Sequence, residues 1–373
     1  MKKTVLNGVD RIDQYRHLFE GKRVGLITNP TGVNKNLVPT ADILFDMGVL
    51  VCMFSPEHGV RGNAQAGKHI ESYTDEKTGI PVYSLYGDKP HIPKEAMDRI
   101  DIVAFDIQDI GARYYTYMYT LSYAMEDCAA AEKTIVVFDR VNPVGGESPQ
   151  GNILDTAFSS FVGRYPLAAR HNLTIGEYAL YINQTQNIGC DLEIIPLSGW
   201  SRSDHYDDTD LLWIPPSPNI PTADTALCYI GNCLFEGTNL SEGRGTTRPF
   251  ECIGAPWLDG EKVAERFNQM GLSGVKARGC WFTPVFSKHA GVPCGGVFFH
   301  ITDKRAYRPF ESALYMLDII RRTHAELAFT PFIDLLFGTD VIRSDTFNAE
   351  EYLKTLCPAL QLHEKEIKEY YLY

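Results

Sequence analysis

The sequence lacks the motifs that most often mark nucleotide binding or an activated serine. No G-x-G-x-x-G follows the first predicted strand and there is no Walker loop, so the glycine-rich cradle for a dinucleotide or a triphosphate is missing. There is also no G-x-S-x-G elbow, since the nearest candidate, Gly146–Pro149, has the sequence Gly-Glu-Ser-Pro. These absences argue against nucleotide-dependent enzymes and against hydrolases built on a serine elbow.

Paired cysteines and regular metal-binding spacings are also missing. The nine cysteines form no C-x-x-C pair, and several lie in apolar runs, where a free cysteine behaves as a small buried hydrophobe (Cys52, Cys128, Cys228 and Cys233). This usage favours a reducing compartment over a disulfide scaffold. No H-x-x-x-H pair stands beside a glutamate among the ten histidines. We therefore expect neither a metal nor a cofactor.

Positive charge is scarce, and so are long apolar runs. The chain has 35 Lys and Arg against 47 Asp and Glu, a formal net charge of −12, which argues against nucleic acid and anionic membranes as partners. No apolar run reaches the roughly 18 residues of a membrane span. The beginning of the chain, Met1–Asp10, has two lysines but no apolar signal region. We expect a cytoplasmic protein that acts on a small molecule, or a secreted one if the native N-terminus is longer.

The order of the predicted elements indicates a parallel sheet. Apolar β-rich segments, predicted as strands, alternate with helical patterns such as those at 36–47 and 115–133; the strands are 22–30, 49–54, 102–109, 134–140 and 192–197. Such alternation is typical of right-handed parallel crossovers. From residue 256 the pattern changes to a mixture of aromatic runs at 281–286 and 296–301 with helices at 260–270 and 310–327. We predict a Rossmann-like α/β domain over 1–232 and a smaller α+β domain over 233–373.

Polar side chains follow four of these strands. The first strand ends in Asn29-Pro30, and the next ends in Pro56, Glu57 and His58; the later two end in Gln108 and Asp109 with Arg113, and in Arg140 with Asn142. Ligands of open α/β sheets bind at the carboxyl ends of the strands, which share one edge. The sequence therefore predicts a site at this edge, covered by a polar loop at 63–77.

The chemistry available there is acid–base catalysis by carboxylates. Glu57 and Asp109 follow separate strands, and paired carboxyl groups beside a cleft are typical of glycoside hydrolysis. Asp106 is the poorer candidate, because within the strand it would pair with an arginine in the core. Glu177 has a structural explanation, because it stands three residues after Thr174 in a capping box.

Two further segments have the composition of a binding surface. The proline-rich stretch 213–221 is predicted to form either a wall of the cleft or a strap between domains. The glycine-rich passage 235–250 contains hydroxyl groups, backbone donors and two arginines, which suit a polyhydroxylated or anionic ligand, although a flexible linker is the alternative.

These motifs together resemble one family, the exo-β-N-acetylmuramidases. The resemblance extends over essentially the whole chain and rests on GLITNPTG (25–32), SPEHG (55–59), DIQD (106–109) with Gly111, Arg113 and Tyr114–Tyr117, Asp139-Arg140 with Asn142-Pro143, and GTN (237–239) with SEGRGT (241–246). It implies a cleft between two domains and hydrolytic release of a non-reducing terminal N-acetylmuramic acid from peptidoglycan fragments. The glutamate proposed as catalytic in this family falls on Glu57.

We predict the following roles from the residues and the resemblance together. Glu57 donates a proton to the glycosidic oxygen and His58 orients it, while Asp109 or a tyrosine of the Tyr114-Tyr115 pair assists at the anomeric carbon. If the substrate's 2-acetamido group is the nucleophile, Asp109 orients that group instead. Arg244 or Arg61 would hold the lactyl carboxylate. The predicted catalytic residues are Glu57, His58, Asp109 and Tyr115; the predicted substrate-binding residues are Asn29, Arg61, Gln108, Arg113, Tyr114, Arg140, Asn142, Asn219, Glu236, Thr238, Arg244 and Thr246.

Two other classes of function stay open at this point. One is a muropeptide-binding or other carbohydrate-binding protein without turnover, which would bind sugar and release none. The other is a Rossmann-type transferase or oxidoreductase, which the missing phosphate loop disfavours.

Overall fold

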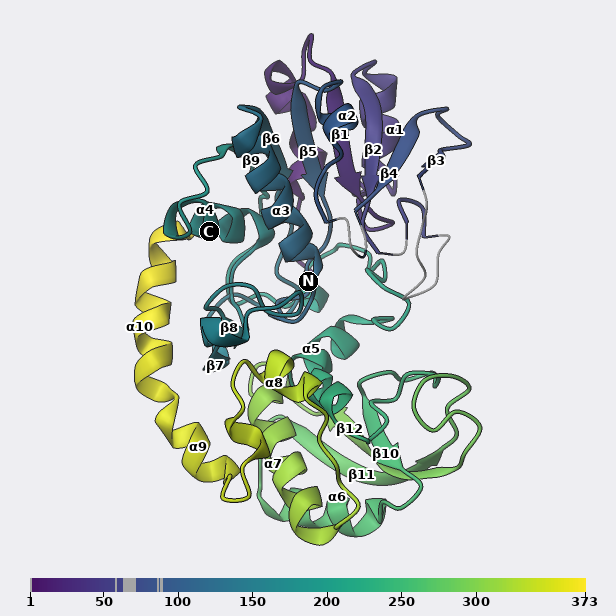
Figure 1. The fold of residues 1–373 in the computed structure, drawn as a ribbon, viewed down its shortest axis with the longest axis vertical. Helices are drawn as coiled ribbons and strands as arrows, with labels where there is room; N and C mark the ends of the chain where they lie inside the picture. Colours follow the sequence, from purple (N-terminus) through teal and green to yellow (C-terminus); the bar gives the residue numbers. More distant parts are fainter. Residues whose placement is uncertain (1, 58, 63–71, 86, 88–89) are drawn as a thin grey trace.

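The computed structural model describes residues 2–57, 59–62, 72–85, 87 and 90–373. His58 and most of the predicted lid, residues 63–71, therefore lie outside the described residues. Figure 1 shows an upper part built on the parallel sheet and a lower part that contains β10, β11 and β12. This arrangement confirms the predicted mixed α/β fold with a mostly parallel sheet.

The large sheet has seven strands, in the order β3-β4-β2-β1-β5-β6-β9. Every neighbouring pair is parallel except β3 with β4. The strands are β1 (Val24–Thr28), β2 (Leu50–Ser55), β3 (Tyr73–Thr74), β4 (Pro81–Ser84), β5 (Ile102–Asp106), β6 (Thr134–Phe138) and β9 (Asp191–Ile195).

Alternate residues of the central strands enter two different cores. In β5, Val103 and Phe105 belong to one apolar cluster, whereas Ile102 and Ala104 belong to another. This follows from the strand's period of two, since successive side chains point to opposite faces. The face with Val103 and Phe105 is covered by the helices α2 (Lys94–Met97), α3 (Tyr117–Ala130) and α4 (Ile175–Thr185). The opposite face is covered by η1 (Gly8–Leu18) and α1 (Thr40–Asp46), which come earlier in the chain.

The second part of the chain contains a three-stranded antiparallel sheet in the order β10-β12-β11. Helices pack around this sheet, and a small two-stranded sheet lies between the two parts (Figure 1). The elements are β7 (Gln150–Ile153), β8 (Ala168–Arg170), α5 (Ala223–Asn232), η4 (Cys233–Gly237), β10 (Cys252–Ala255), α6 (Gly260–Gln269), β11 (Val275–Phe282), β12 (Cys294–Ile301), α7 (Pro309–Thr323), α8 (Phe332–Phe337) and the short turns η2 (Thr156–Phe158), η3 (Tyr206–Asp208) and η5 (Val341–Arg343).

The last helices return to the parallel sheet. Figure 1 shows α9 (Ala349–Thr355) and α10 (Cys357–Ile367) running up one side of the molecule to α4. After η6 (Lys368–Tyr370), the Tyr373 hydroxyl donates to Asp139 at 2.7 Å, and the Leu372 amide donates to Glu177. The final segment of the chain thus returns from the smaller domain and contacts the larger one. The boundary between the domains at 232/233 stays a prediction.

Local sequence predicted the central parallel strands, β12 and the helices α1, α3, α4, α6 and α7, with one clear displacement. The capping box of Thr174 and Glu177 at the start of α4 is confirmed. The predicted strand at 281–286 is wrong in position, because β11 covers Val275–Phe282 and ends where that segment begins. β11 pairs with β12, and the residues in its first half alternate between buried and exposed. Because the exposed positions are the charged Lys276 and Arg278, this half has no continuous apolar run and was not predicted as a strand.

One buried arginine joins the two parts. Arg113 is 0% exposed, and its guanidinium donates to the backbone carbonyls of Asn152 and Leu167 in the first part and of Leu336 and Phe337 in α8, at 2.7–3.1 Å. Burial lowers the pKa of Arg113. Arg113 was predicted to bind substrate, but both of its terminal nitrogens donate to main-chain oxygens, which indicates a structural position.

We expect Arg113→Met to lower the free energy of unfolding by about 3 kcal/mol or more, because four buried carbonyl oxygens lose a charged donor. Urea denaturation followed by circular dichroism measures this loss. Arg16→Ala is the control, since exposed Arg16 pairs only with Asp13 and its loss should cost less than about 0.5 kcal/mol. Equal stabilities of the two variants would contradict the joining role.

A buried histidine in α10 should make the stability of the fold sensitive to acid. His363 is buried, and desolvation, with nearby positive charge from His171 and Arg113, lowers its pKa to about 4. Between pH 6.5 and 4 the unfolded chain binds a proton that the folded protein does not, so stability falls as the pH falls. We expect His363→Gln to lose about 2 kcal/mol less than the wild type between pH 7 and pH 5. Parallel urea titrations at both pH values would test this, and identical losses would refute it.

Candidate active site

A cavity of about 200 Å³ lies between the two parts of the chain. Its wall combines aromatic side chains with two carboxylates and one arginine. Six of the predicted site residues line it, although they come from distant segments of the sequence: Glu57, Tyr114, Tyr115, Asn219, Glu236 and Arg244. The proline-rich stretch 213–221 contributes Ser217, Asn219 and Ile220, so it forms part of the wall, as one of its two predicted roles required.

Glu57 reaches this cavity because β2 ends at Ser55. Pro56 terminates the strand, and the half-buried Glu57 follows at the carboxyl edge of the parallel sheet. Its backbone carbonyl lies 3.5 Å from the hydroxyl of Tyr117, which also donates to the carbonyl of Pro216 at 2.9 Å. Tyr117 therefore links the strand end to the proline-rich wall.

Tyr115 lies beside the predicted catalytic carboxylates. Its ring is buried and packs edge-on against Tyr117 and Tyr229, with centroids 5.2 and 5.8 Å away. Burial first, and then the negative groups near its hydroxyl, Asp109 and Glu57 among them, raise the pKa of Tyr115 well above its usual value. The hydroxyl accordingly keeps its proton and can act as a hydrogen-bond donor.

Asp109 is close to Tyr115 but is not among the side chains that line the cavity. It is buried, and its Oδ2 accepts a hydrogen bond from the Gly111 amide at 2.7 Å. The Nε2 of buried His171 lies 3.1 Å from the same oxygen. Its other oxygen, Oδ1, is buried and has no hydrogen-bond partner among the described residues.

An alternating row of charges begins in the C-terminal wall of the cavity, with Glu236 and Arg244, and continues behind it. Arg244 contacts Glu236 at 2.8 Å and Glu242 at 3.4 Å, and Glu242 in turn lies 3.2 Å from Lys288. Burial raises the pKa of Glu236, while Arg244 opposes this shift. Although burial alone would lower it, the pKa of Arg244 is raised by the two carboxylates. Arg244 is therefore a permanent cation in a largely apolar wall.

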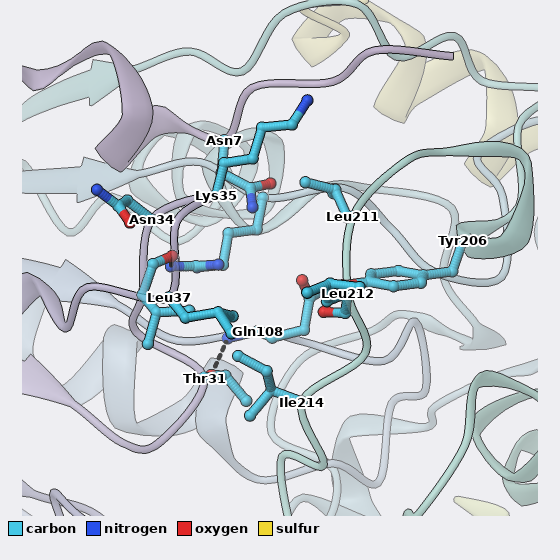
Figure 2. Close-up of a pocket in the computed structure, with 12 residues that line it drawn as sticks. Asn7, Thr31, Asn34, Lys35, Leu37, Gln108, Tyr206, Leu211, Leu212 and Ile214 are labelled. Atoms are coloured by element: carbon cyan, nitrogen blue, oxygen red, sulfur yellow. Dashed lines mark hydrogen bonds between the residues drawn. The ribbon is translucent and has the colours of Figure 1, made fainter. Parts of the chain in front are cut away.

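Gln108 and Arg140 line a different cavity, shown in Figure 2. The backbone N–H of Gln108 donates to the hydroxyl oxygen of Thr31 at 2.9 Å, and Arg140 forms an ion pair with the buried Asp106 at 2.5 Å. The pairing confirms the structural explanation for Asp106. This cavity has about 20 Å³, room for about one water molecule, so it does not fit a sugar.

The other predicted binding residues lie outside the cavity between the domains. Asn29 and Arg61 line a third cavity of about 250 Å³, and Arg61 forms ion pairs with Asp75 and Asp42. The remaining ones donate mainly to backbone carbonyls: Asn142 to His171 and Leu173, Thr238 to Phe235, and Thr246 to Gly243. Thr238 and Thr246 thereby stabilise the loop that carries Glu236 and Arg244.

The sequence did not single out several aromatic residues that line the cavity. These are Phe161, Tyr229, Phe250 and Phe332, joined by Val162, Cys233 and Leu336. Each stands in an apolar or irregular stretch that is indistinguishable from core by composition. No signal short of the tertiary contacts would have found them.

Two absences concern the described residues only. Among them, no group of three or more His, Cys, Asp or Glu side chains is arranged to hold a metal ion. Within the same residues, no helix has the length and apolar character needed to cross a membrane.

Comparison with known proteins agrees with this architecture. A family model described as exo-β-N-acetylmuramidase NamZ, N-terminal, matches residues 24–224, and the corresponding C-terminal model matches residues 227–373. The peptidoglycan β-N-acetylmuramidase NamZ of Bacillus subtilis (strain 168) is 43% identical over 383 residues, which cover 100% of this chain and 92% of the relative.

Two crystal structures of DUF1343 family proteins from Bacteroides fragilis NCTC 9343 have the same fold. One is 34% identical with a TM-score of 0.91 and the other 31% identical with a TM-score of 0.79, and each pair covers 99% of both chains. The resemblance identified from the sequence motifs is confirmed: the chain belongs to the exo-β-N-acetylmuramidase family.

Proposed function

We propose that this protein is a glycoside hydrolase that releases a non-reducing terminal β-N-acetylmuramic acid from peptidoglycan fragments. The observation that carries the proposal is the cavity between the domains, where Glu57 of one wall faces the same space as Arg244 and Glu236 of the other. Its volume of about 200 Å³ is below the ~300–1,000 Å³ of cavities that take drug-sized ligands. A site of this size suits one sugar ring, which is what an exo-acting enzyme needs.

Glu57 is the proton donor in this proposal. Its carboxyl group transfers a proton to the glycosidic oxygen as the bond from that oxygen to the anomeric carbon breaks, so the leaving group departs as a neutral alcohol. His58, the next residue, is the proposed orienting partner and lies outside the described residues.

The anomeric carbon is attacked by the oxygen of the substrate's own 2-acetamido group. Water then opens this cyclic intermediate, and the Glu57 carboxylate takes up the proton that the water loses, which restores the starting state. In this proposal the Tyr115 hydroxyl, which keeps its proton, donates a hydrogen bond at the reacting centre. Asp109, which does not line the cavity, stabilises the charge that develops on the amide nitrogen through the neighbouring Tyr115.

Arg244 is the proposed partner of the lactyl carboxylate that distinguishes muramic acid from N-acetylglucosamine. It is the cation of the cavity wall, whereas Arg61 and Arg113 are engaged elsewhere. Arg244 is 28% exposed and already contacts two carboxylates, so an incoming lactyl group would share its remaining donors.

We also propose that the enzyme works on recycled muropeptides in the cytoplasm. All nine cysteines are free, and seven of them are buried without disulfide partners, which suits a reducing compartment. Cys190, one of the buried seven, contacts Cys128 without a disulfide.

Replacing Glu57 with glutamine should reduce turnover at least a thousandfold, because the amide cannot donate the proton. Release of muramic acid from the disaccharide N-acetylmuramyl-β-1,4-N-acetylglucosamine is the measurement, with circular dichroism as the check on folding. Near-normal rates in Glu57→Gln would remove this residue as the acid. Wild-type protein that binds the disaccharide but never cleaves it would favour a carbohydrate-binding protein.

Replacing Arg244 with lysine should lower kcat/KM for a chromogenic β-N-acetylmuraminide by about 10- to 100-fold, since a bidentate charged contact is lost. Activity on the matching β-N-acetylglucosaminide, which lacks the lactyl ether, should change little. Arg248→Gln is the matched control, because Arg248 is in the same loop, half-exposed, and outside the cavity wall. An equal loss on both substrates would exclude Arg244 as the lactyl partner.

A further inference from the structure

Two phenylalanines of the cavity between the domains differ from its other aromatic residues. The tyrosines that line the cavity and Phe250 are at most 8% exposed, as expected for an enclosed wall. Phe161 and Phe332 line the same cavity but are 43% and 37% exposed. They therefore lie where the cavity opens to solvent, one contributed by each part of the chain.

Phe161 is presented by a closed turn. The Ser160 amide donates to the Gly163 carbonyl at 2.7 Å, and the Gly163 amide donates back to Ser160 at 3.2 Å. Phe161 and Val162 occupy the tip of this turn. A Cβ on Gly163 would lie 3.7 Å from the Leu335 carbonyl oxygen, so the turn packs directly beside α8.

Phe332 is the first residue of α8, and this helix is fixed in place. A Cβ on Gly237 would lie 2.5 Å from the Cα of Ile333, so the helix start is pressed against η4. The same turn, η4, carries Glu236 of the cavity wall. Both exposed rings thus project from backbone segments that pack closely against neighbouring elements.

The contact of exposed aromatic rings with water is unfavourable, and a ligand that covers the rings removes this contact. Exposed apolar surface of this kind therefore often marks a binding site. In an exo-acting glycosidase the terminal sugar fills the cavity, so the sugar on the other side of the scissile bond must emerge through the opening. The apolar C–H face of a pyranose ring can stack on an aromatic ring at this place.

We infer that Phe161 and Phe332 form the subsite for the leaving-group sugar, which is the saccharide unit bound to the reducing side of the terminal muramic acid. This inference rests on the proposed function. The two rings would select substrates with a sugar leaving group and would leave binding of muramic acid itself unchanged.

The test compares a disaccharide with a monosaccharide. We expect Phe161→Ala and Phe332→Ala each to lower kcat/KM for N-acetylmuramyl-β-1,4-N-acetylglucosamine about tenfold, while Ki for free N-acetylmuramic acid as a competitive inhibitor stays within twofold of the wild type. Phe161→Tyr and Phe332→Tyr should restore most of the activity, because they retain the ring. Leu362→Ala is the control, since Leu362 is 71% exposed on α10 and outside the cavity wall.

Each outcome separates the subsite from the proposed function. Unchanged kcat/KM in both alanine variants would overturn the subsite while wild-type turnover upholds the hydrolase. A rise in Ki for the monosaccharide that matches the loss on the disaccharide would also overturn it, because the rings would then contact muramic acid itself. Wild-type protein that releases no muramic acid would overturn the proposed function and the subsite together.

Discussion

The relative position of the two parts of this protein depends on one buried cation. The Arg113 guanidinium donates to main-chain oxygens of both parts, and in the absence of a carboxylate partner among the described contacts these carbonyl dipoles offset the cost of its burial. The cavity with Glu57 has walls from both parts, so its geometry depends on the position of one part relative to the other. α10 and the final residues also connect the two parts of the chain (Figure 1).

Within the cavity, charge is concentrated on the wall of the smaller domain. Arg244 lies between two carboxylates, and Lys288 balances the second of them. The wall of the larger domain contributes Glu57 and the tyrosines, of which Tyr115 keeps its proton because burial raises its pKa. This division separates the proposed proton transfer from the proposed recognition of the lactyl group, so each can be altered without the other.

The expectation that all four strand ends serve one site was only partly met. Parallel strands do bring their carboxyl ends to one edge, but a β-strand directs successive side chains to opposite faces. Glu57 and the tyrosines after β5 reach the cavity between the domains, while Gln108 and Arg140 help to line a separate cavity of about 20 Å³. One or two residues of offset after a strand decide between these places, and strand boundaries cannot be predicted that closely from sequence.

The sequence by itself determined the parallel fold, the family and the position of Glu57 at a strand end, because these depend on local periodicity and on contiguous motifs. It also determined the capping role of Glu177, since a capping box spans only four residues. Only the tertiary structure decided which arginine is available to a ligand, because the partners of Arg61, Arg113 and Arg244 lie in other segments of the chain or across a turn. It alone placed Phe161 beside α8, since the burial of an aromatic ring depends on what packs over it and is not encoded in its neighbours along the chain.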